Sequence, residues 1–183
     1  LDETLFAEPS FNFSMGYSKS NIGDEITYID PAQADPLPRT DRLGYGISTG
    51  FDLLTDDFRI NAFNLSFTVE ADDILIDRDA IGSANWEYQS TLSDLDFSKN
   101  IIQIEGDDKI VSRTGTKLEF VETFSYSFGH FSGRGYPDPR GTNGYEIRAK
   151  GLLKLCALWA KHPVTDFLKD HFDIRYYNTN YFA

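Results

Sequence analysis

Residues 143–156, NGYEIRAKGLLKLC, alternate between two kinds of side chain along their whole length. Small and apolar residues fill one set of alternate positions: Tyr145, Ile147, Ala149, Gly151, Leu153 and Leu155. Most of the charge falls on the other set: Glu146, Arg148, Lys150, Leu152, Lys154 and Cys156. Strict alternation is typical of a β-strand with one apolar and one polar face. Because a tilted strand crosses a bilayer with about 9–11 residues, the pattern predicts one long strand through position 156, in the wall of a soluble or a membrane barrel.

The composition of the chain favours strands and excludes several kinds of function. Aromatic residues make up 15% of the 183 residues, which suits strands better than helices. The formal net charge of -12 argues against nucleic acid as a partner, because binding to phosphates needs positive charge. The single cysteine, Cys156, rules out an internal disulfide and a zinc site built from cysteines. The sequence begins at Leu1 without a methionine or a signal segment, so we expect a processed protein or a piece of a longer one.

Five further segments alternate in the same way, and turn-rich stretches separate them. The six predicted strands are 10–18, 43–52, 58–70, 117–131, 143–156 and 171–182. In the third of them the apolar residues change sides, which predicts a β-bulge near residues 62–64. We also expect a small hairpin at 101–105 and 109–113, and a short helix within 157–170 that breaks at Pro163. Together these segments predict an all-β, antiparallel protein.

The lengths of the connections suggest that the two ends of the sheet differ. In an up-and-down barrel, successive connections alternate between the two rims. The connections 19–42, 71–116 and 157–170 are long, whereas 53–57 and 132–142 are shorter. Short turns on one rim and long loops on the other are typical of outer-membrane barrels. A soluble antiparallel barrel or sandwich would show the same alternation along its strands, so both interpretations stay open on pattern alone.

No stretch of the sequence predicts a catalytic, metal or cofactor site. The three histidines, His130, His162 and His171, match no zinc-binding spacing. Neither a nucleophile elbow nor a dinucleotide-binding fingerprint is present. The acidic run at 72–79 lacks the glycine and glutamate of an EF-hand, so we expect a solvated acidic loop there. We therefore predict a protein that is not an enzyme and that needs no cofactor.

A membrane barrel would place the polar side of the long strand toward its interior. The charged residues expected to face this lumen are Glu146, Arg148, Lys150 and Lys154. In a channel such side chains would tune selectivity, and in a closed wall they would form ion pairs that brace it.

One connection carries a more specific signal. It contains Asn21-Ile22-Gly23, then residues 26–30 (ITYID), residues 33–39 (QADPLPR) and Arg42-Leu43-Gly44. This segment resembles the PorV-like family of outer-membrane proteins, which are relatives of the FadL-like β-barrels. The resemblance implies a transmembrane antiparallel barrel of about 14 strands, within the size range of such barrels. Six strands cannot close a barrel of that size, so the chain is expected to be roughly its C-terminal half.

The resemblance also implies a function and a location. It implies a non-enzymatic component of type IX secretion in the bacterial outer membrane, which binds and shuttles the C-terminal domains of secreted proteins. Its partners would be outer-membrane lipid and other protein chains of a secretion or surface complex, docked on the long loops. The candidate partner-binding residues are Asp30, Asp35, Pro36, Leu37, Pro38 and Arg39. A FadL-like transporter of hydrophobic small molecules is the alternative, and a soluble β-domain of a surface complex is a third hypothesis.

Overall fold

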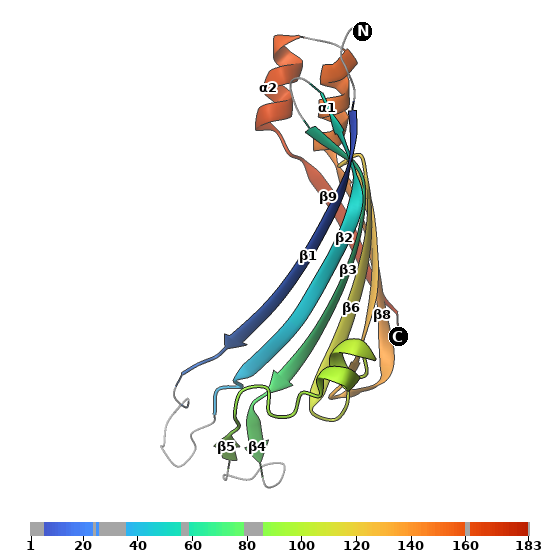
Figure 1. Ribbon diagram of the computed structural model, residues 1–183. Coiled ribbons are helices and arrows are strands. Elements are labelled where there is room, and N and C mark those ends of the chain that lie inside the picture. The colour runs from blue at the N-terminus through green and yellow to red at the C-terminus, as the bar shows by residue number, and fades with distance from the viewer. Residues whose placement is uncertain are drawn as a thin grey trace.

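Seven strands form one curved antiparallel sheet in the computed structural model, in the order β1-β2-β3-β6-β7-β8-β9 (Figure 1). The strands are β1 (Phe6–Ser20), β2 (Thr40–Leu54), β3 (Arg59–Ile74), β6 (Ile110–Phe120), β7 (Phe124–Gly133), β8 (Tyr136–Arg148) and β9 (Arg175–Phe182). The structure describes residues 6–23, 25, 36–55, 59–78, 86–159 and 162–182. Each strand pairs with its neighbours in chain order, so the sheet is a simple meander. The predicted antiparallel β-architecture is confirmed at this level.

The alternation seen in the sequence becomes two distinct faces of this sheet. Phe13, Ile47 and Phe67 are register partners on adjacent strands, and they belong to the side that we call the apolar face. The residues adjacent to them in the sequence, Ser14, Gly46 and Thr68, also oppose one another and belong to the polar face. Because successive side chains of a strand point to opposite faces, the register assigns every strand residue to one face or the other.

The β-bulge predicted in the third strand is present. Phe51 pairs with Phe63, but the next residue, Asp52, pairs with Asn61, so Ala62 is an extra residue in β3. An inserted residue moves all later side chains to the opposite face. The bulge therefore keeps both halves of β3 in step with β2.

The predicted strand 117–131 is wrong, because the chain turns back in the middle of it. Residues up to Phe120 belong to β6 and residues from Phe124 belong to β7, and these two residues are register partners. The amide of Thr123 donates to the carbonyl of Phe120, which closes the turn. The sheet therefore has seven long strands, where the sequence predicted six.

The predicted strand 143–156 is correct only as far as Arg148. The helix α1 (Ala149–Trp159) follows at once, and α2 (Pro163–His171) then leads back to β9. No β-branched residue occurs between Ala149 and Trp159, and the segment is rich in leucine and lysine, which favour helix over strand. The break predicted at Pro163 is confirmed, and this proline is the first residue of α2.

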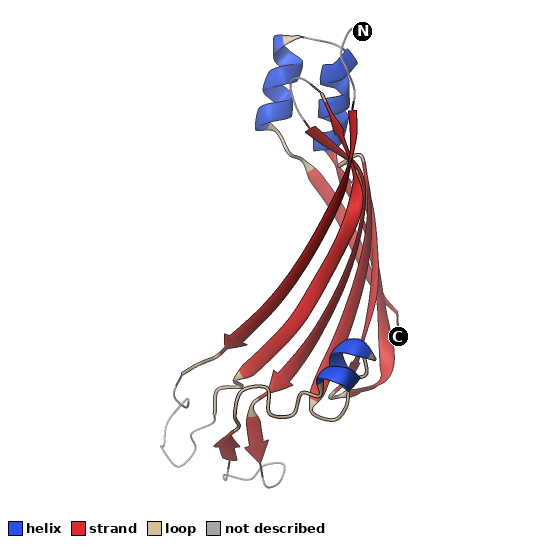
Figure 2. Cartoon of the chain, viewed as in Figure 1, coloured by secondary structure: helices blue, strands red, loops and turns tan. Residues whose placement is uncertain are grey.

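The additional turn changes which connections share a rim. The α1–α2 segment lies at the same end of the sheet as the β2–β3 and β6–β7 connections, and opposite β4 (Ile76–Arg78) and β5 (Trp86–Tyr88) (Figures 1 and 2). The prediction that 157–170 shares a rim with the loops at 19–42 and 71–116 is therefore wrong. We call the end with α1 and α2 the helical rim, and the opposite end the loop rim.

The segment between β5 and β6 builds the small core of the molecule at the loop rim. Its π-helical turn η2 (Phe97–Ile102) places Ile101 against Ala71 and Ile110 of the apolar face. The hairpin predicted at 101–105 and 109–113 is wrong, because residues 110–113 belong to β6 and a different pair of short strands, β4 and β5, forms a hairpin here.

The expectation of a solvated acidic loop is also wrong at its first two residues. Asp72 and Asp73 both lie in β3 and are buried. Asp73 accepts a hydrogen bond from the amide of Asp94 in the segment that covers it. The fold over the loop rim therefore depends on buried carboxylates as well as on apolar contacts.

Candidate functional site: the two faces of the sheet

The apolar face carries a continuous row of large side chains near the helical rim. The row is defined by register partners on six adjacent strands: Phe51, Phe63, Phe120, Phe124, Ile147 and Tyr176. Phe63 and Phe120 are in ring contact, with centroids 5.4 Å apart. We call this set the aromatic row.

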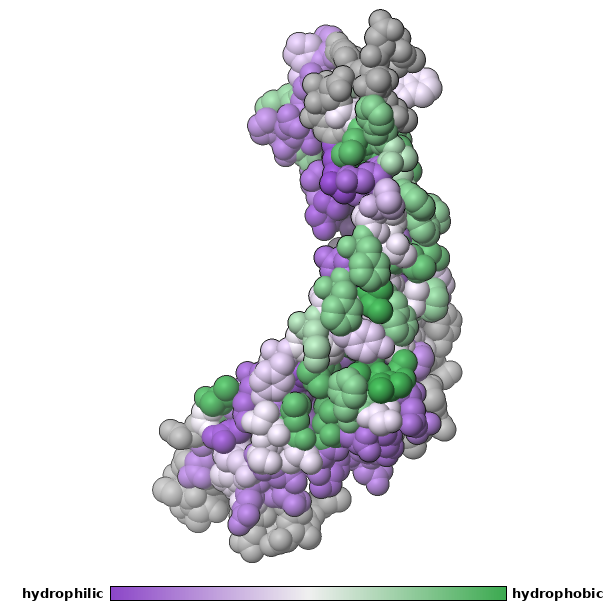
Figure 3. Space-filling view, viewed as in Figure 1, coloured by the Kyte–Doolittle hydropathy of each residue, from purple (hydrophilic) through white to green (hydrophobic). Residues whose placement is uncertain are grey.

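Most of the apolar face is open to its surroundings. Phe13 is 59% exposed and Met15 is 63% exposed, and other large side chains of this face are also accessible: Phe11, Ile47, Leu65, Tyr126, Phe128 and Tyr145. Hydrophobic residues gather across the middle of the molecule in Figure 3, between hydrophilic zones at the two ends. Soluble monomers rarely expose contiguous apolar patches of more than a few hundred Å², so this face points to an apolar environment.

The apolar face is interrupted on one side. Register places polar side chains on the loop-rim half of β6 to β9: Thr114, Thr116, His130, Asn143, Asn178 and Asn180. Thr114 and His130 lie within hydrogen-bonding distance at 3.0 Å, and Asn143 donates to the hydroxyl of Tyr126 at 3.1 Å. We call this set the polar patch.

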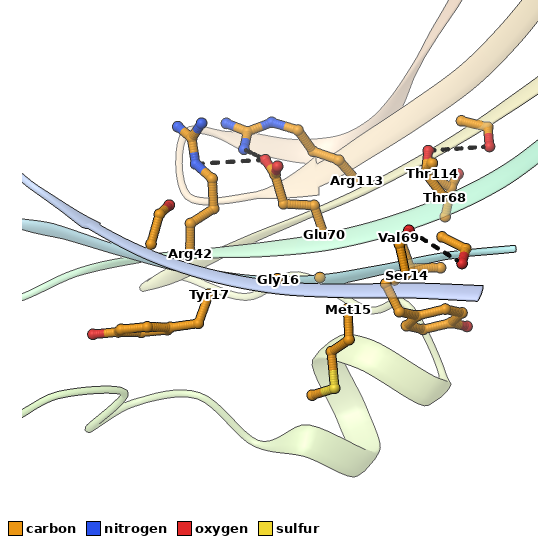
Figure 4. Close-up of a pocket in the computed structure, with 15 residues that line it drawn as sticks. Ser14, Met15, Gly16, Tyr17, Arg42, Thr68, Val69, Glu70, Arg113 and Thr114 are labelled. Carbon is orange, nitrogen blue, oxygen red and sulfur yellow. Dashed lines mark hydrogen bonds and ion pairs between the residues drawn. The ribbon is translucent and has the colours of Figure 1, made fainter. Parts of the chain in front are cut away.

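The polar face is hollowed and is lined by small and charged residues. One groove of about 640 Å³ lies across β1, β2, β3 and β6 (Figure 4). The side chains of Arg42, Glu70 and Arg113 lie together on one side of the sheet in this view, whereas Met15 and Tyr17 extend from the other side. The close-up therefore agrees with the faces assigned from the register.

Four charged side chains form a closed lattice at this groove. Arg113 donates to Glu70 at 2.9 Å and to Asp72 at 3.1 Å. Arg42 approaches the same two carboxylates at 3.6 Å each. The two arginines thus neutralise two acids on the strand between them, so the lattice braces β2, β3 and β6 and adds no net charge.

The predicted lumen residues Glu146 and Arg148 lie on the polar face of β8 and join further ion pairs. Glu146 lies 3.5 Å from Lys117 and 4.0 Å from Arg175. Arg148 donates to Asp173, which precedes β9 and also accepts from Arg175. Hydrogen bonds from Arg148 and then Arg175 hold the pKa of the Asp173 carboxyl well below its usual range. These ion pairs therefore link β8 to β9 and, across β7, to β6.

Lys150 and Lys154 were predicted on the same strand face, and the structure places both in α1 instead. Lys154 leaves the sheet and reaches the β6–β7 turn, where its ammonium donates to both carboxylate oxygens of Glu122 at 2.8 Å. It also donates to the carbonyl of Arg59 at 2.7 Å. Glu122 in turn accepts from the amide of Asn61, so one lysine links α1 to two connections of the helical rim.

Lys154→Met is expected to destabilise the folded protein by about 1–3 kcal/mol, because the largely buried carboxylate of Glu122 loses its charged donor. The free energy of unfolding in urea, measured by tryptophan fluorescence, checks this. Lys150→Met is the matched control, since it removes the same charge from the same helix. Equal losses in the two variants would contradict the role assigned to the Lys154–Glu122 pair.

The candidate partner-binding segment is only partly described. Asp30 and Asp35 lie outside the described residues. Pro36 is buried, and the carbonyl of Leu37 accepts from the hydroxyl of Tyr88. The guanidinium of Arg39 stacks on the ring of Tyr88, 3.5 Å from its centroid, and donates to the carbonyl of Gly23.

These contacts attach the segment to the loop rim. The carbonyl of Pro38 accepts from Asn21, and the carbonyl of Arg39 accepts from the amide of Leu75. Further along the chain, Arg42 lies 3.6 Å from Glu70 and 3.6 Å from Asp72 of β3. The described residues of the segment, 36–39, are thus held on the rim by Tyr88 of β5, by the side chain of Asn21 and by the backbone of Gly23 and Leu75.

The histidines serve local structure. His162 caps α2 by accepting from the amide of Val164, and His171 stacks on Phe167 with ring centroids 4.4 Å apart. Among the described residues, no group of three or more His, Cys, Asp or Glu side chains is placed to hold a metal ion.

Within the described ranges, no helix is both long and apolar enough to cross a membrane. Comparison with known proteins adds no relative, since no family model, no curated protein and no solved structure matches this chain.

Proposed function

We propose that the chain is part of an outer-membrane β-barrel of the PorV-like kind, and that it acts without catalysis, as a protein-binding component of type IX secretion. The observation that supports this proposal most is that one side of the sheet is apolar and exposed, whereas the opposite side is polar and carries charged residues. A membrane barrel has this arrangement, with apolar side chains toward lipid and polar ones toward the interior.

The alternative of a soluble sandwich needs a second layer on the apolar face, because a sheet in aqueous solution must shield its apolar side from water. In the part of the chain that the structure describes, only the segment around η2 covers this face, at the loop rim. The lengths of the strands also favour the membrane. The strands β1, β2 and β3 have 15, 15 and 16 residues, and a tilted strand crosses a bilayer with about 9–11.

The edges of the sheet define what would close the barrel. No described residue pairs with the outer side of β1 or of β9. Open edges are not tolerated in lipid, so further strands of a longer polypeptide are proposed to join the two edges. Because seven antiparallel strands leave β1 and β9 running in the same direction, all-antiparallel closure requires an odd number of additional strands.

Protein partners are favoured over hydrophobic small molecules. The residues that the polar face contributes to the groove are glycines, serines, Thr68 and the charged Arg42, Glu70 and Arg113, and these polar side chains favour a protein partner. The polar patch also needs polar neighbours, since amides and hydroxyls in a membrane wall are stable only against other polar groups. A protein chain against β8 and β9 would supply them.

Partition tests the membrane part of this proposal. We expect the protein to remain in the membrane fraction after carbonate extraction, to dissolve only in detergent, and to migrate differently on gels before and after boiling. A monodisperse protein in detergent-free buffer would contradict the proposal. The purified C-terminal domain of a type IX-secreted protein tests the partner class. Binding of that domain is expected, and binding of fatty acids alone would instead favour a FadL-like transporter.

A further inference from the structure

The helix α1 carries an exposed apolar stripe that no described residue covers. Leu152, Cys156 and Trp159 follow one another at i, i+4 and i+7, which places them on one side of the helix. Trp159 is 88% exposed and Leu152 is 51% exposed. The opposite side of α1 packs against the rim, where Gly151 and Ala157 are buried. An exposed tryptophan beside exposed leucine is an unusual surface for an element that faces water.

A second apolar stripe lies on the neighbouring helix, which packs beside α1. Val164 and Phe167 are spaced i, i+3 in α2 and are both exposed by more than half. The segment that leaves α2 continues the stripe with Phe172 and Ile174, of which Ile174 is 67% exposed. Each helix of the pair therefore has one side turned away from the rest of the protein, and both of these sides are apolar.

These stripes lead into the aromatic row of the sheet. The carbonyl of Ile174 accepts from the amide of Ala149, so the start of α1 and the start of β9 lie side by side. Two residues further along, Tyr176 is the register partner of Ile147, and both belong to the aromatic row. The helix pair thus stands at the end of the apolar face, at the level where a bilayer would pass from hydrocarbon to headgroups.

The charge of this segment differs from that of the chain. Residues 149–171 contain four lysines, two aspartates and two histidines, a formal charge of +2 with neutral histidines, whereas the whole chain carries -12. Lys154 forms an ion pair with Glu122, and Lys169 lies near Asp166 and Asp170. A net positive segment in an acidic protein matches a surface of anionic headgroups.

We infer that the α1–α2 pair is an interfacial element that lies in the headgroup layer of the membrane at the helical rim, and that it binds anionic lipid through the exposed stripe containing Trp159. This inference rests on the proposed membrane location of the sheet, and it adds a lipid contact that the barrel alone does not require. Tryptophan suits this position because its ring is apolar and its N–H reaches the polar layer.

The two tryptophans of the chain make the inference testable with the whole protein. A Trp86→Phe variant leaves Trp159 as the only tryptophan. It is reconstituted in phosphatidylcholine vesicles with and without phosphatidylglycerol, which contain lipids brominated near the headgroup or deep in the acyl chain. We expect blue-shifted Trp159 emission, stronger quenching by the shallow bromines than by the deep ones, and stronger quenching when phosphatidylglycerol is present.

A second reporter separates this inference from the proposed function. An Ile47→Trp variant without the native tryptophans (Trp86→Phe and Trp159→Phe) reports on the middle of the apolar face. If bromines quench that probe but not Trp159, the sheet is in the membrane and the inference is overturned. If they quench neither probe, the membrane location itself fails, and the inference fails with it. Blue-shifted but unquenched Trp159 emission would show that protein covers the helix pair, and equal quenching with and without phosphatidylglycerol would overturn the anionic preference.

Discussion

Ile47→Arg is expected to prevent most of the protein from inserting into lipid vesicles. Ile47 lies in β2 on the apolar face, and its register partners on either side are Phe13 and Phe67. Neither phenylalanine can accept a hydrogen bond from a guanidinium at this position, which would face the hydrocarbon. An arginine on the lipid face of a membrane barrel costs about 2–4 kcal/mol near the bilayer midplane. The yield of protein with a heat-dependent shift on gels, after folding into vesicles, measures the effect.

The adjacent residue provides the matched control. Ser48 belongs to the polar face, with Asn12 and Ser66 as its register partners. Ser48→Arg introduces the same side chain one residue further along the same strand, but into the hydrated interior. We expect its folding yield to stay close to that of the unmodified protein. If both variants fold equally well, the apolar face is not in lipid, since a substitution on a water-exposed surface usually changes stability by less than about 0.5 kcal/mol.

The residue types of the strands explain why much of the sheet could be predicted from the sequence. Over residues 10–18 of β1 and 43–51 of β2, one face is almost entirely apolar and the other is glycine, serine and asparagine, so the two-residue period is unambiguous. The bulge at Ala62 was also predictable, because the large apolar side chains change from one set of alternate positions to the other at this point of the sequence. The predicted faces of these strands therefore follow from the order of residue types along the chain.

The β6–β7 turn could not be predicted, for two physical reasons. Val121 and Glu122 both have positive φ, 53° and 49°, but the sequence has no Gly, Asn or Asp there to signal such a turn. The alternation also passes through it unbroken, since Phe120 and Phe124 are register partners on the same face. Tertiary contacts hold the turn instead, including a hydrogen bond from the amide of Val121 to Ala62.

The helix α1 was missed because its sequence satisfies both periods. Lys150 and Lys154 continue the set of alternate positions that carries the charged residues of the strand, but they are also spaced i, i+4, as on one face of a helix. The exposed stripe at Leu152, Cys156 and Trp159 has the spacing of a helix face, and this spacing was the signal that could have identified the helix. The charged residues of the polar face were predictable as a class, but their partners depend on the register between strands, which the sequence of one strand does not contain.

Gly151→Ala is expected to destabilise the protein by about 2–3 kcal/mol, within the range for overpacked sites. In an ordinary helix the same change stabilises by up to about 1 kcal/mol, because alanine favours helix more than glycine does. Gly151 is buried in α1, and a Cβ atom there would lie 1.7 Å from the carbonyl oxygen of Val121 and 2.4 Å from the hydroxyl of Thr123. The helix and the β6–β7 turn would have to separate, and the Lys154–Glu122 contact would lengthen with them.

The free energy of unfolding in urea decides the sign of this effect, and Gly16→Ala is the control. A Cβ atom at Gly16 would meet nothing within 4 Å, so this variant is expected to stay within about 0.5 kcal/mol of the unmodified protein. A loss confined to Gly151→Ala shows that α1 is pressed against the turn, as a fixed helical rim requires. A gain in stability at position 151 would mean that α1 does not pack there, and the interfacial position inferred for Trp159 would then lose its structural support.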